Sequence, residues 1–398
     1  MPPFRALSCW AVLLALAPTA LVVTVSTTPA AAPPAARARL LGVEVGPHGV
    51  GFEVRRPDSS ARSGPGADGP RVGLAVWYPA DVDPGRAGID ALDYRLLDRL
   101  DPPTDALRRS FAESEAATLM ASPHVGIVPM TKEQALASLS AAGMAVRHVP
   151  WSQGRFPAVV ILGGPYYLST TAEVLASHGI VAVAPFRFHD PQPHDGDRPF
   201  SAYIEDALAD ADWALGELRA MRGVDAARVA ALGHGGGGFQ ALLLAMRSRN
   251  VSAIVNIDAG NFSTRTNPGQ LSFYRPGEVR VPYLYIATAQ TRATQDLFDD
   301  FMKMQASDRA EVVLQERALR HHDLSDFGRG VTAIGIRGDA QAQVQASYAI
   351  VQRLVVRFLD DVWSRDARNH AEFLTWLRDR TKTASFTASL HPASAREP

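Results

Sequence analysis

The sequence is nearly devoid of cysteine, since Cys9 is the only one among 398 residues. A single thiol cannot form an internal disulfide, and Cys9 precedes an apolar segment, where it is badly placed for lipid attachment. Removal of the leader described below would leave a chain without cysteine. The mature protein is therefore expected to have no disulfide framework, no thiol nucleophile and no thiolate metal site.

The sequence also lacks an excess of either charge. Its 40 Lys and Arg residues are balanced by 41 Asp and Glu residues, and no block of like charge stands out. This balance gives no reason to expect nucleic acid or an anionic membrane surface as a partner. Because 46% of the residues are hydrophobic, the chain can build a sizeable globular core. The sequence leaves the oligomeric state open.

A leader segment is indicated at the N-terminus. Arg5 precedes the apolar residues 10–25, and the segment TTPAAAPPAARA follows. A basic start, an apolar centre and small residues are typical of a secretory signal peptide. We expect residues 1–38 to be a signal peptide with a short linker, cleaved between residues 30 and 38, and the mature protein to be secreted or periplasmic. The run is short for a spanning helix, so no stable membrane span is expected after cleavage; an uncleaved anchor is the alternative.

The rest of the chain is expected to form one domain over residues 39–380. From residue 156 onward, short apolar segments alternate with helical patterns, which indicates a mostly parallel sheet covered by helices on both faces. The expected strands lie at 158–162, 180–186, 228–233, 252–258, 282–288 and 311–315, and the expected helices at 171–178, 200–221, 237–249, 294–305 and 341–363.

Segments outside this alternation carry their own predictions. Two short strands are expected within residues 40–54, and a strand is expected at 71–80 after a loop at 55–70. Residues 90–149 have the apolar spacing of helices and are expected to form a helical insertion, a possible lid over a site. The polar residues 381–398 are expected to be a loose tail.

One glycine-rich turn raises the question of function. Residues 230–243 read AALGHGGGGFQALL, an apolar strand that runs through a tight turn into a helix. The turn fits the frame G-x-S-x-G of a nucleophile elbow from Gly233 to Gly237, except that Gly235 stands where the serine belongs. Four consecutive glycines also resemble a phosphate-binding loop, but no Gly-Lys-Ser/Thr follows them. The turn therefore has the frame of a nucleophile elbow without its side chain.

Residues 71–360 resemble the α/β-hydrolase superfamily, most closely its platelet-activating factor acetylhydrolase and dienelactone hydrolase branches. The resemblance implies an α/β-hydrolase fold with a mostly parallel central sheet, a small-molecule ester or lipid-like ligand, and neither cofactor nor metal. The segments that carry it are VWYPA (76–80), FPAVVILGG (156–164), LASHGIVAVAPF (175–186), VDAARVAALGHGGGG (224–238), NIDAG (256–260) and RHHDLSDF (320–327).

The resemblance also implies site residues. It places the triad acid at Asp258, the triad base at His321 and the nucleophile position at Gly235. Glycine offers no hydroxyl for His321 to activate, and loss of the nucleophile from a serine triad costs on the order of a millionfold in turnover. His234 adjoins the gap, but residues beside a nucleophile normally point away from the pocket, so we do not expect it to replace the serine.

A second departure concerns the oxyanion loop. Members of the superfamily usually carry His-Gly after the third strand, whereas this chain has Gly163, Gly164 and Pro165. Pro165 has no N–H to donate, and one missing oxyanion donor costs about a hundred- to a thousandfold. A shifted loop would offer the N–H of Gly164 or Tyr166 instead. The other expected donor, the N–H of Gly236, is retained.

Three hypotheses follow. The chain is a hydrolase-like protein that binds a ligand or partner without catalysis; or it is an ester hydrolase in which His321 activates water directly; or it is an esterase whose serine was lost recently, naturally or by construction. The non-catalytic alternatives for the two residues are that Asp258 only ends a strand and that His321 lies at the surface. His322 and Asp323 are expected to face solvent or cap the next helix.

Two further groups of side chains have less specific interpretations. The loop at 187–197 holds His189, Asp190, His194, Asp195 and Asp197, which lack the spacing of known metal motifs and are expected to be solvated. The aromatic residues near strand ends can line a pocket wall or belong to the core; they are Tyr166, Tyr167 and Phe186.

Overall fold

In a computed structural model of the chain, the described residues belong to one compact unit. The expected signal peptide and most of the loop at 55–70 lie outside the described residues. The structure describes residues 42–56, 72–83, 86–98, 104–121, 129–188, 200–259, 271–294, 303–306, 308–326, 330, 334–364, 366–381 and 386–392.

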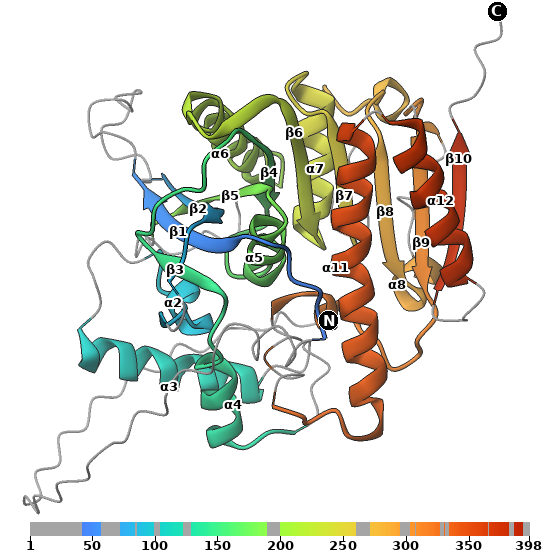
Figure 1. Ribbon diagram of the computed structural model, residues 1–398. Coiled ribbons are helices and arrows are strands. Elements are labelled where there is room, and N and C mark those ends of the chain that lie inside the picture. Colours follow the sequence, from blue (N-terminus) through green and yellow to red (C-terminus); the bar gives the residue numbers. More distant parts are fainter. Residues whose placement is uncertain are drawn as a thin grey trace, which may run out of the picture. The chain divides into compact units, whose positions relative to one another are not determined.

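The described residues form one sheet in the order β10-β9-β8-β7-β6-β4-β5-β2-β1-β3 (Figure 1). The strands from β5 to β9 in this order pair in parallel, and β2 and β10 add antiparallel partners at the two sides. The strands are β1 Gly49–Arg55, β2 Val72–Ala80, β3 Ala145–Arg147, β4 Phe156–Leu162, β5 Val181–Arg187, β6 Val224–His234, β7 Ala253–Ile257, β8 Tyr283–Thr288, β9 Asp308–Leu314 and β10 Phe386–Pro392.

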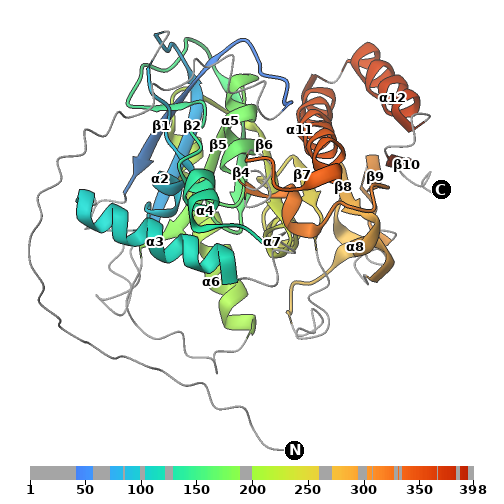
Figure 2. The same ribbon diagram turned by 90° about the horizontal axis from the view of Figure 1, so that it is seen from below.

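Helices cover both faces of this sheet (Figures 1 and 2). The longer helices of the sheet region are α5 Ser169–Ser177, α6 Phe200–Ala220, α7 Gly236–Arg247, α11 Gln341–Ser364 and α12 Ala367–Thr381. The shorter elements and those of the insertion are α2 Ala91–Arg95, α3 Asp105–Ala121, α4 Lys132–Leu139, α8 Ala289–Thr294 and the 3-10 turns η3 Pro276–Glu278, η4 His321–Leu324 and η5 Gly338–Ala340.

The alternation of side chains along each strand explains the two layers. In β4, Val159 and Ile161 pack into the core shared with α5, α11 and α12, whereas Val160 and Leu162 pack into the core shared with α6 and α7. Successive side chains of a strand point to opposite faces, so a strand buried on both faces reads as a continuous apolar run. The fold class predicted from these runs is confirmed.

The order of the strands also positions a site. The chain leaves β4 for β5 on one side and then returns to β6 on the other side of β4. In open α/β sheets, ligands bind where the order reverses in this way, outside the carboxyl ends of the strands. The loop that starts at Gly163 and the turn at Gly235 follow β4 and β6 at this position.

Three local predictions need correction. Residues 386–392 of the tail expected to be loose pair with β9 as the antiparallel strand β10, and residues 367–381 form a further helix, α12. The insertion is not wholly helical, because β3 pairs with β1 in parallel. Within residues 40–54 the described chain holds β1 alone rather than two strands, since residues 43–46 have no partner strand.

None of the described helices combines the length and the apolar composition that crossing a bilayer requires.

Candidate active site

The turn at Gly235 joins the end of β6 to the start of α7. Gly235 has φ of 54° and ψ of −122°, a combination that residues with a side chain rarely adopt. Its N–H donates to the carbonyl of Ile257 (3.0 Å), and its own carbonyl accepts from the N–H of Gly238 (3.1 Å). The backbone therefore has the strained strand-to-helix turn that presents a side chain at the top of the sheet, although residue 235 has none.

The neighbouring glycines allow three backbone segments to meet. A Cβ at Gly233 would lie 2.1 Å from the carbonyl carbon of Gly237, and one at Gly237 would lie 2.1 Å from the carbonyl oxygen of Leu162. Neither distance is possible for a real Cβ atom, so the ends of β4 and β6 and the start of α7 pack this closely only through glycine. The glycine-rich sequence is thus explained by packing.

Asp258 follows β7 and is fully buried. Its N–H donates to the carbonyl of Ile286 (2.6 Å), and its φ of 48° turns the chain out of the strand. One carboxylate oxygen accepts from the N–H of Thr288 (2.6 Å), and the other accepts from the hydroxyl of Thr291 (3.0 Å). Two donors from the end of β8 and the start of α8 therefore fix the orientation of this carboxylate.

His321 completes an acid–base pair with Asp258. Its Nδ1 lies 2.7 Å from Oδ2 of Asp258, and its Nε2 lies 2.9 Å from the position that a Cβ at Gly235 would occupy. Burial alone would raise the pKa of Asp258, but the hydrogen bond and charge of His321 and the N–H of Thr288 hold it below its ordinary value. His321 donates its Nδ1–H to the ionised carboxylate, so its other ring nitrogen, Nε2, faces the position above Gly235.

His234 supports His321 from the other side. Its Nε2 donates to the carbonyl of His321 (2.9 Å), and the two rings stack with centroids 4.3 Å apart. Burial, reinforced by the positive charge of His321, lowers the pKa of His234 to about 3. His234 is therefore neutral at physiological pH. This contact between His234 and His321 was not expected from the sequence.

The short helix that carries His321 is held by a buried ion pair. Asp323 accepts from the N–H of Arg320 (2.8 Å) and pairs with the guanidinium of Arg337 (2.8 Å), and both side chains of the pair are about 95% buried. Arg337 also donates to the carbonyl of Ala318 (2.7 Å). The prediction that Asp323 faces solvent is wrong, while its bond to the N–H of Arg320 is a cap of the kind the sequence suggested.

A second tether joins this segment to the oxyanion loop. The carboxylate of Asp326 accepts from the hydroxyl of Ser169 (2.5 Å) and the N–H of Thr170 (3.0 Å), and its N–H donates to the carbonyl of Tyr167 (2.8 Å). The N-cap residue of α5, Leu168, makes no side-chain cap bond, and Asp326 supplies this cap instead. The sequence carries no periodic signal for either Asp323–Arg337 or Asp326–Ser169.

The oxyanion loop itself is depleted. Gly163 and Gly164 have φ of 95° and 104°, and a Cβ at Gly163 would lie 3.1 Å from the Cα of Gly237. The loop therefore lies against the turn of the elbow, as an oxyanion loop must. Pro165 follows with no N–H. Gly236 is the first residue of α7, where helix N–H groups have no partner within the helix.

No family model matches the chain, and no curated protein does. Its structure is similar to the ferulic acid esterase from Streptomyces cinnamoneus, with a TM-score of 0.52 and 18% sequence identity over 79% of this chain and 89% of that chain. The chain has the α/β-hydrolase fold.

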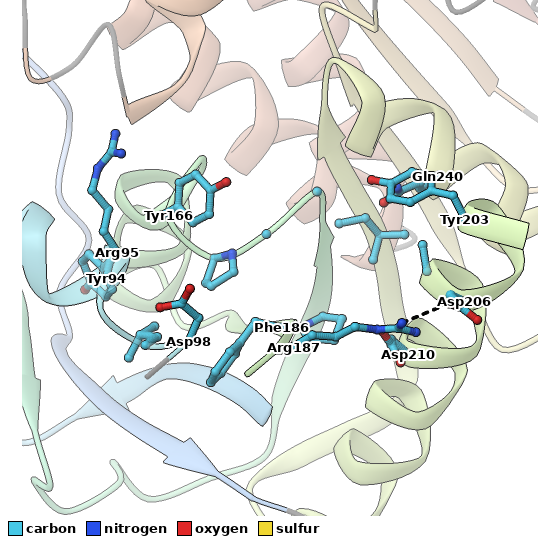
Figure 3. Close-up of a pocket in the computed structure, with 17 residues that line it drawn as sticks. Tyr94, Arg95, Asp98, Tyr166, Phe186, Arg187, Tyr203, Asp206, Asp210 and Gln240 are labelled. Atoms are coloured by element: carbon cyan, nitrogen blue, oxygen red, sulfur yellow. Dashed lines mark hydrogen bonds and ion pairs between the residues drawn. The ribbon is translucent and has the colours of Figure 1, made fainter. Parts of the chain in front are cut away.

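In this α/β-hydrolase fold, a cavity of about 450 Å³ opens beside the oxyanion loop (Figure 3). Gly163, Gly164 and Pro165 line it, whereas Gly235 and His321 do not. A Cβ at Gly163 would lie 3.1 Å from the Cα of Gly237, so the loop that lines the cavity also lies against the elbow. Tyr166 and Phe186 belong to the cavity wall.

The helical insertion contributes one wall of this cavity through α2. Tyr94 is buried, its hydroxyl donates to the carboxylate of Glu173 (2.7 Å) and accepts from the indole N–H of Trp77 (3.0 Å). Arg95 lies over the ring of Tyr166, with 5.6 Å between its guanidinium carbon and the ring centroid. These contacts tie α2 to the sheet and to the oxyanion loop, and the expectation that the insertion forms a lid stays a prediction.

Metal and cofactor sites were not expected from the sequence. Within the residues that the structure describes, no group of three or more His, Cys, Asp or Glu side chains is arranged to hold a metal ion. The loop residues His189, Asp190, His194, Asp195 and Asp197 lie outside the described residues.

The structure therefore brings Asp258, His321, His234 and Gly235 into one cluster, with Gly236 next to it and the oxyanion loop against it. Their roles in a reaction stay predictions.

Proposed function

We propose that this chain is a hydrolase-like protein that has lost covalent catalysis and binds a small ester-like or related ligand. The observation that carries the proposal is the 2.9 Å distance between Nε2 of His321 and the position of an absent Cβ at Gly235. A general base that Asp258 holds in place faces a position without a nucleophile.

Two independent departures support this interpretation. Glycine at position 235 removes the attacking oxygen, and Pro165 removes one expected N–H of the oxyanion loop. The cavity beside that loop remains, so ligand binding does not depend on either missing atom. The structure is similar to a protein named as a ferulic acid esterase, and this name supports an ester-like ligand.

Labelling with a fluorophosphonate tests the loss of covalent catalysis. Such a probe bonds to an activated serine oxygen, so we expect intact-protein mass spectrometry to find no adduct on the protein as it is. Gly235→Ser is the matched positive control, because it supplies the missing hydroxyl beside His321. An adduct on a side chain of the unaltered site, or fast ester turnover abolished by His321→Ala, would overturn the proposal.

The intact Asp258–His321 pair favours one alternative function, direct hydrolysis by water. The proton of a water molecule would pass to Nε2 of His321, the water oxygen would bond to the acyl carbon, and the departing alkoxide would take the proton from Nε2. This route predicts slow ester hydrolysis without a burst, and loss of that activity in His321→Ala. Absence of turnover across a panel of esters and lactones would exclude it.

We also propose that the protein is secreted or periplasmic, with kinship to the acetylhydrolase branch of the superfamily. The basic residue, apolar run and small residues of positions 1–38 support secretion. N-terminal sequencing of the exported protein tests it: a start between residues 30 and 39 is expected, and a cell-associated chain that begins at Met1 would contradict it.

A further inference from the structure

The cavity beside the oxyanion loop has a lining that is unusually polar for a site expected to hold a lipid-like ligand. Among the residues that the structure describes, five charged side chains line it, together with tyrosine hydroxyls and an amide. Its volume of about 450 Å³ falls within the range of about 300–1,000 Å³ that is usual for small-molecule sites. The charged residues are Arg95, Asp98, Arg187, Asp206 and Asp210.

The carboxylates outnumber the guanidinium groups in this lining. Arg187 donates from Nε to Asp210 (2.6 Å) and from Nη1 to Asp206 (3.0 Å), so one cation is shared between two anions (Figure 3). Burial lowers the pKa of Arg187, but its bonds to Asp210 and Asp206 raise it by more. The pKa therefore lies above its ordinary value, and the guanidinium stays charged. A ligand carboxylate or phosphate would compete with two carboxylates already in place.

The second arginine is also engaged by an acid. Arg95 pairs with Glu115 of α3, which does not line the cavity, while Asp98 adds a carboxylate to the lining. With two arginines and three aspartates, the charged side chains of the cavity carry one formal negative charge. The lining therefore disfavours anions.

The polar atoms of the wall suit hydroxyl groups. The amide of Gln240 donates to the hydroxyl of Tyr203 (3.3 Å) at one side of the cavity, and Asp206, whose side chain is 35% exposed, offers carboxylate oxygens as acceptors. The rings of Tyr166 and Phe186 add apolar faces. Burial raises the pKa of Tyr166 above its ordinary value, so its phenol stays protonated and able to donate.

From this lining we infer that the cavity binds a neutral, hydroxyl-rich molecule of the sugar class, and that it excludes carboxylates. Vicinal hydroxyls would bond to the carboxylate, amide and phenol groups, and the apolar face of a sugar ring would pack on Tyr166 or Phe186. The inference rests on the proposed ligand-binding function and deepens it. The cavity takes the polyol half of an ester, because its polar wall suits hydroxyl groups, and it rejects the free acid that hydrolysis would release, because that acid is a carboxylate.

Ligands that share one ring and differ in charge test this inference. Saturation-transfer NMR titrations of the full chain would use methyl β-D-glucopyranoside, the matching glucuronide and tetramethylammonium. We expect the glucoside to bind at least about tenfold more tightly than the glucuronide, a ratio equal to about 1.4 kcal/mol. Asp206→Asn should reduce this ratio to near one, because it removes the repulsion. Asp98→Asn, on another wall, should move the ratio the same way.

The matched control is Asp212→Asn. Asp212 lies on the same helix, α6, but pairs with Arg247 (3.3 Å) and does not line the cavity, so the ratio should be unchanged. Equal binding of the glucuronide, tighter binding of tetramethylammonium, or no binding of the glucoside would each overturn the inference. A phosphonate adduct together with the expected glucoside preference would refute only the loss of catalysis. No adduct and no glucoside binding would refute only the ligand class.

Discussion

The two halves of the candidate active site are preserved to different degrees. On one side, Asp258 and His321 are held by hydrogen bonds from Thr288, Thr291 and His234, and the proton acceptor is complete. The other side has the backbone of a nucleophile elbow and an oxyanion loop but lacks their reacting atoms, because Gly235 has no side chain and Pro165 has no N–H.

This difference separates what packing maintains from what chemistry requires. Each support of the acid–base half also satisfies a buried polar group, so its loss would carry a folding cost even without catalysis. The hydroxyl of a nucleophile and one oxyanion N–H satisfy no such need. Their absence leaves the fold intact, which is why the depleted half can exist beside a complete one.

Restoring the missing atoms gives the largest expected effect. Gly235→Ser supplies the nucleophile, and because both proteins lack the oxyanion donor, that loss cancels in the comparison. The cost of a missing nucleophile, about a millionfold, is the upper limit of the gain, and we expect ester turnover to rise by at least about a thousandfold. Adding Pro165→Ala should raise it again, by about a hundredfold, if the loop then donates an N–H. Steady-state assays with p-nitrophenyl acetate measure both steps.

Geometry limits how easily this rescue works. The new Cβ would lie 2.9 Å from Nε2 of His321, so the ring must withdraw by a few tenths of an ångström, and positive φ at a residue with a side chain costs about 1–3 kcal/mol. Gly235→Ser combined with His321→Ala is the control and should stay inactive. Unchanged turnover in a folded Gly235→Ser variant would mean that the acid–base half is not competent either.

Much of this arrangement is predictable from the sequence, because it depends on local pattern. The apolar runs predict the parallel strands, and the glycine spacing from Gly233 to Gly237 predicts the elbow. Asp258 and His321 each follow a strand, and carboxyl ends of parallel strands meet at one edge of a sheet. Their proximity could therefore be expected, whereas their distances could not.

The supports of the site escaped prediction for a physical reason. Arg337 and Asp323 meet through the tertiary fold, and no periodicity marks them. The contact of His234 with His321 depends on the backbone turn at Gly235, which side-chain statistics do not reveal. By contrast, α12 could have been predicted, because Phe373 and Leu377 are four residues apart, as on one face of a helix, and both are buried. The otherwise polar composition of the segment obscured this pattern.

The elbow of the depleted half still requires glycine at position 237 for close backbone packing. Gly237→Ala places a Cβ 2.1 Å from the carbonyl oxygen of Leu162, a backbone atom that cannot move aside cheaply. We expect a loss of at least about 3 kcal/mol in the free energy of unfolding, measured by denaturant titration.

Gly216→Ala is the matched control for this change. Gly216 lies within α6, and a Cβ there would meet nothing within 4 Å. We expect it to stabilise the protein by up to about 1 kcal/mol through helix propensity. Should Gly237→Ala prove as harmless as Gly216→Ala, close packing would not explain the glycine frame of the turn, and the contrast between the two halves would lose its structural basis.

The last prediction concerns His234, which links the two halves because it belongs to the elbow and contacts the base. Its pKa in the folded chain, about 3, lies below the ordinary value of 6.5. The unfolded chain therefore binds a proton below pH 6.5 that the folded chain does not. Stability from neutral His234 is present above pH 6.5 and is lost as the pH falls toward 3, by on the order of 1.4 kcal/mol per pH unit.

His234→Gln should remove this component of the pH dependence, because an amide can still donate to the carbonyl of His321 and does not titrate. Denaturant titrations at pH 7.5, 6, 5 and 4 should give a shallower fall for the variant than for the unaltered protein. Asp258 adds a loss of its own in both proteins, because its depressed pKa removes stability only as the pH falls below about 4. Parallel slopes between pH 6 and 5 would therefore mean that His234 is protonated in the folded chain, and that the complete half of the site carries a charge which its burial argues against.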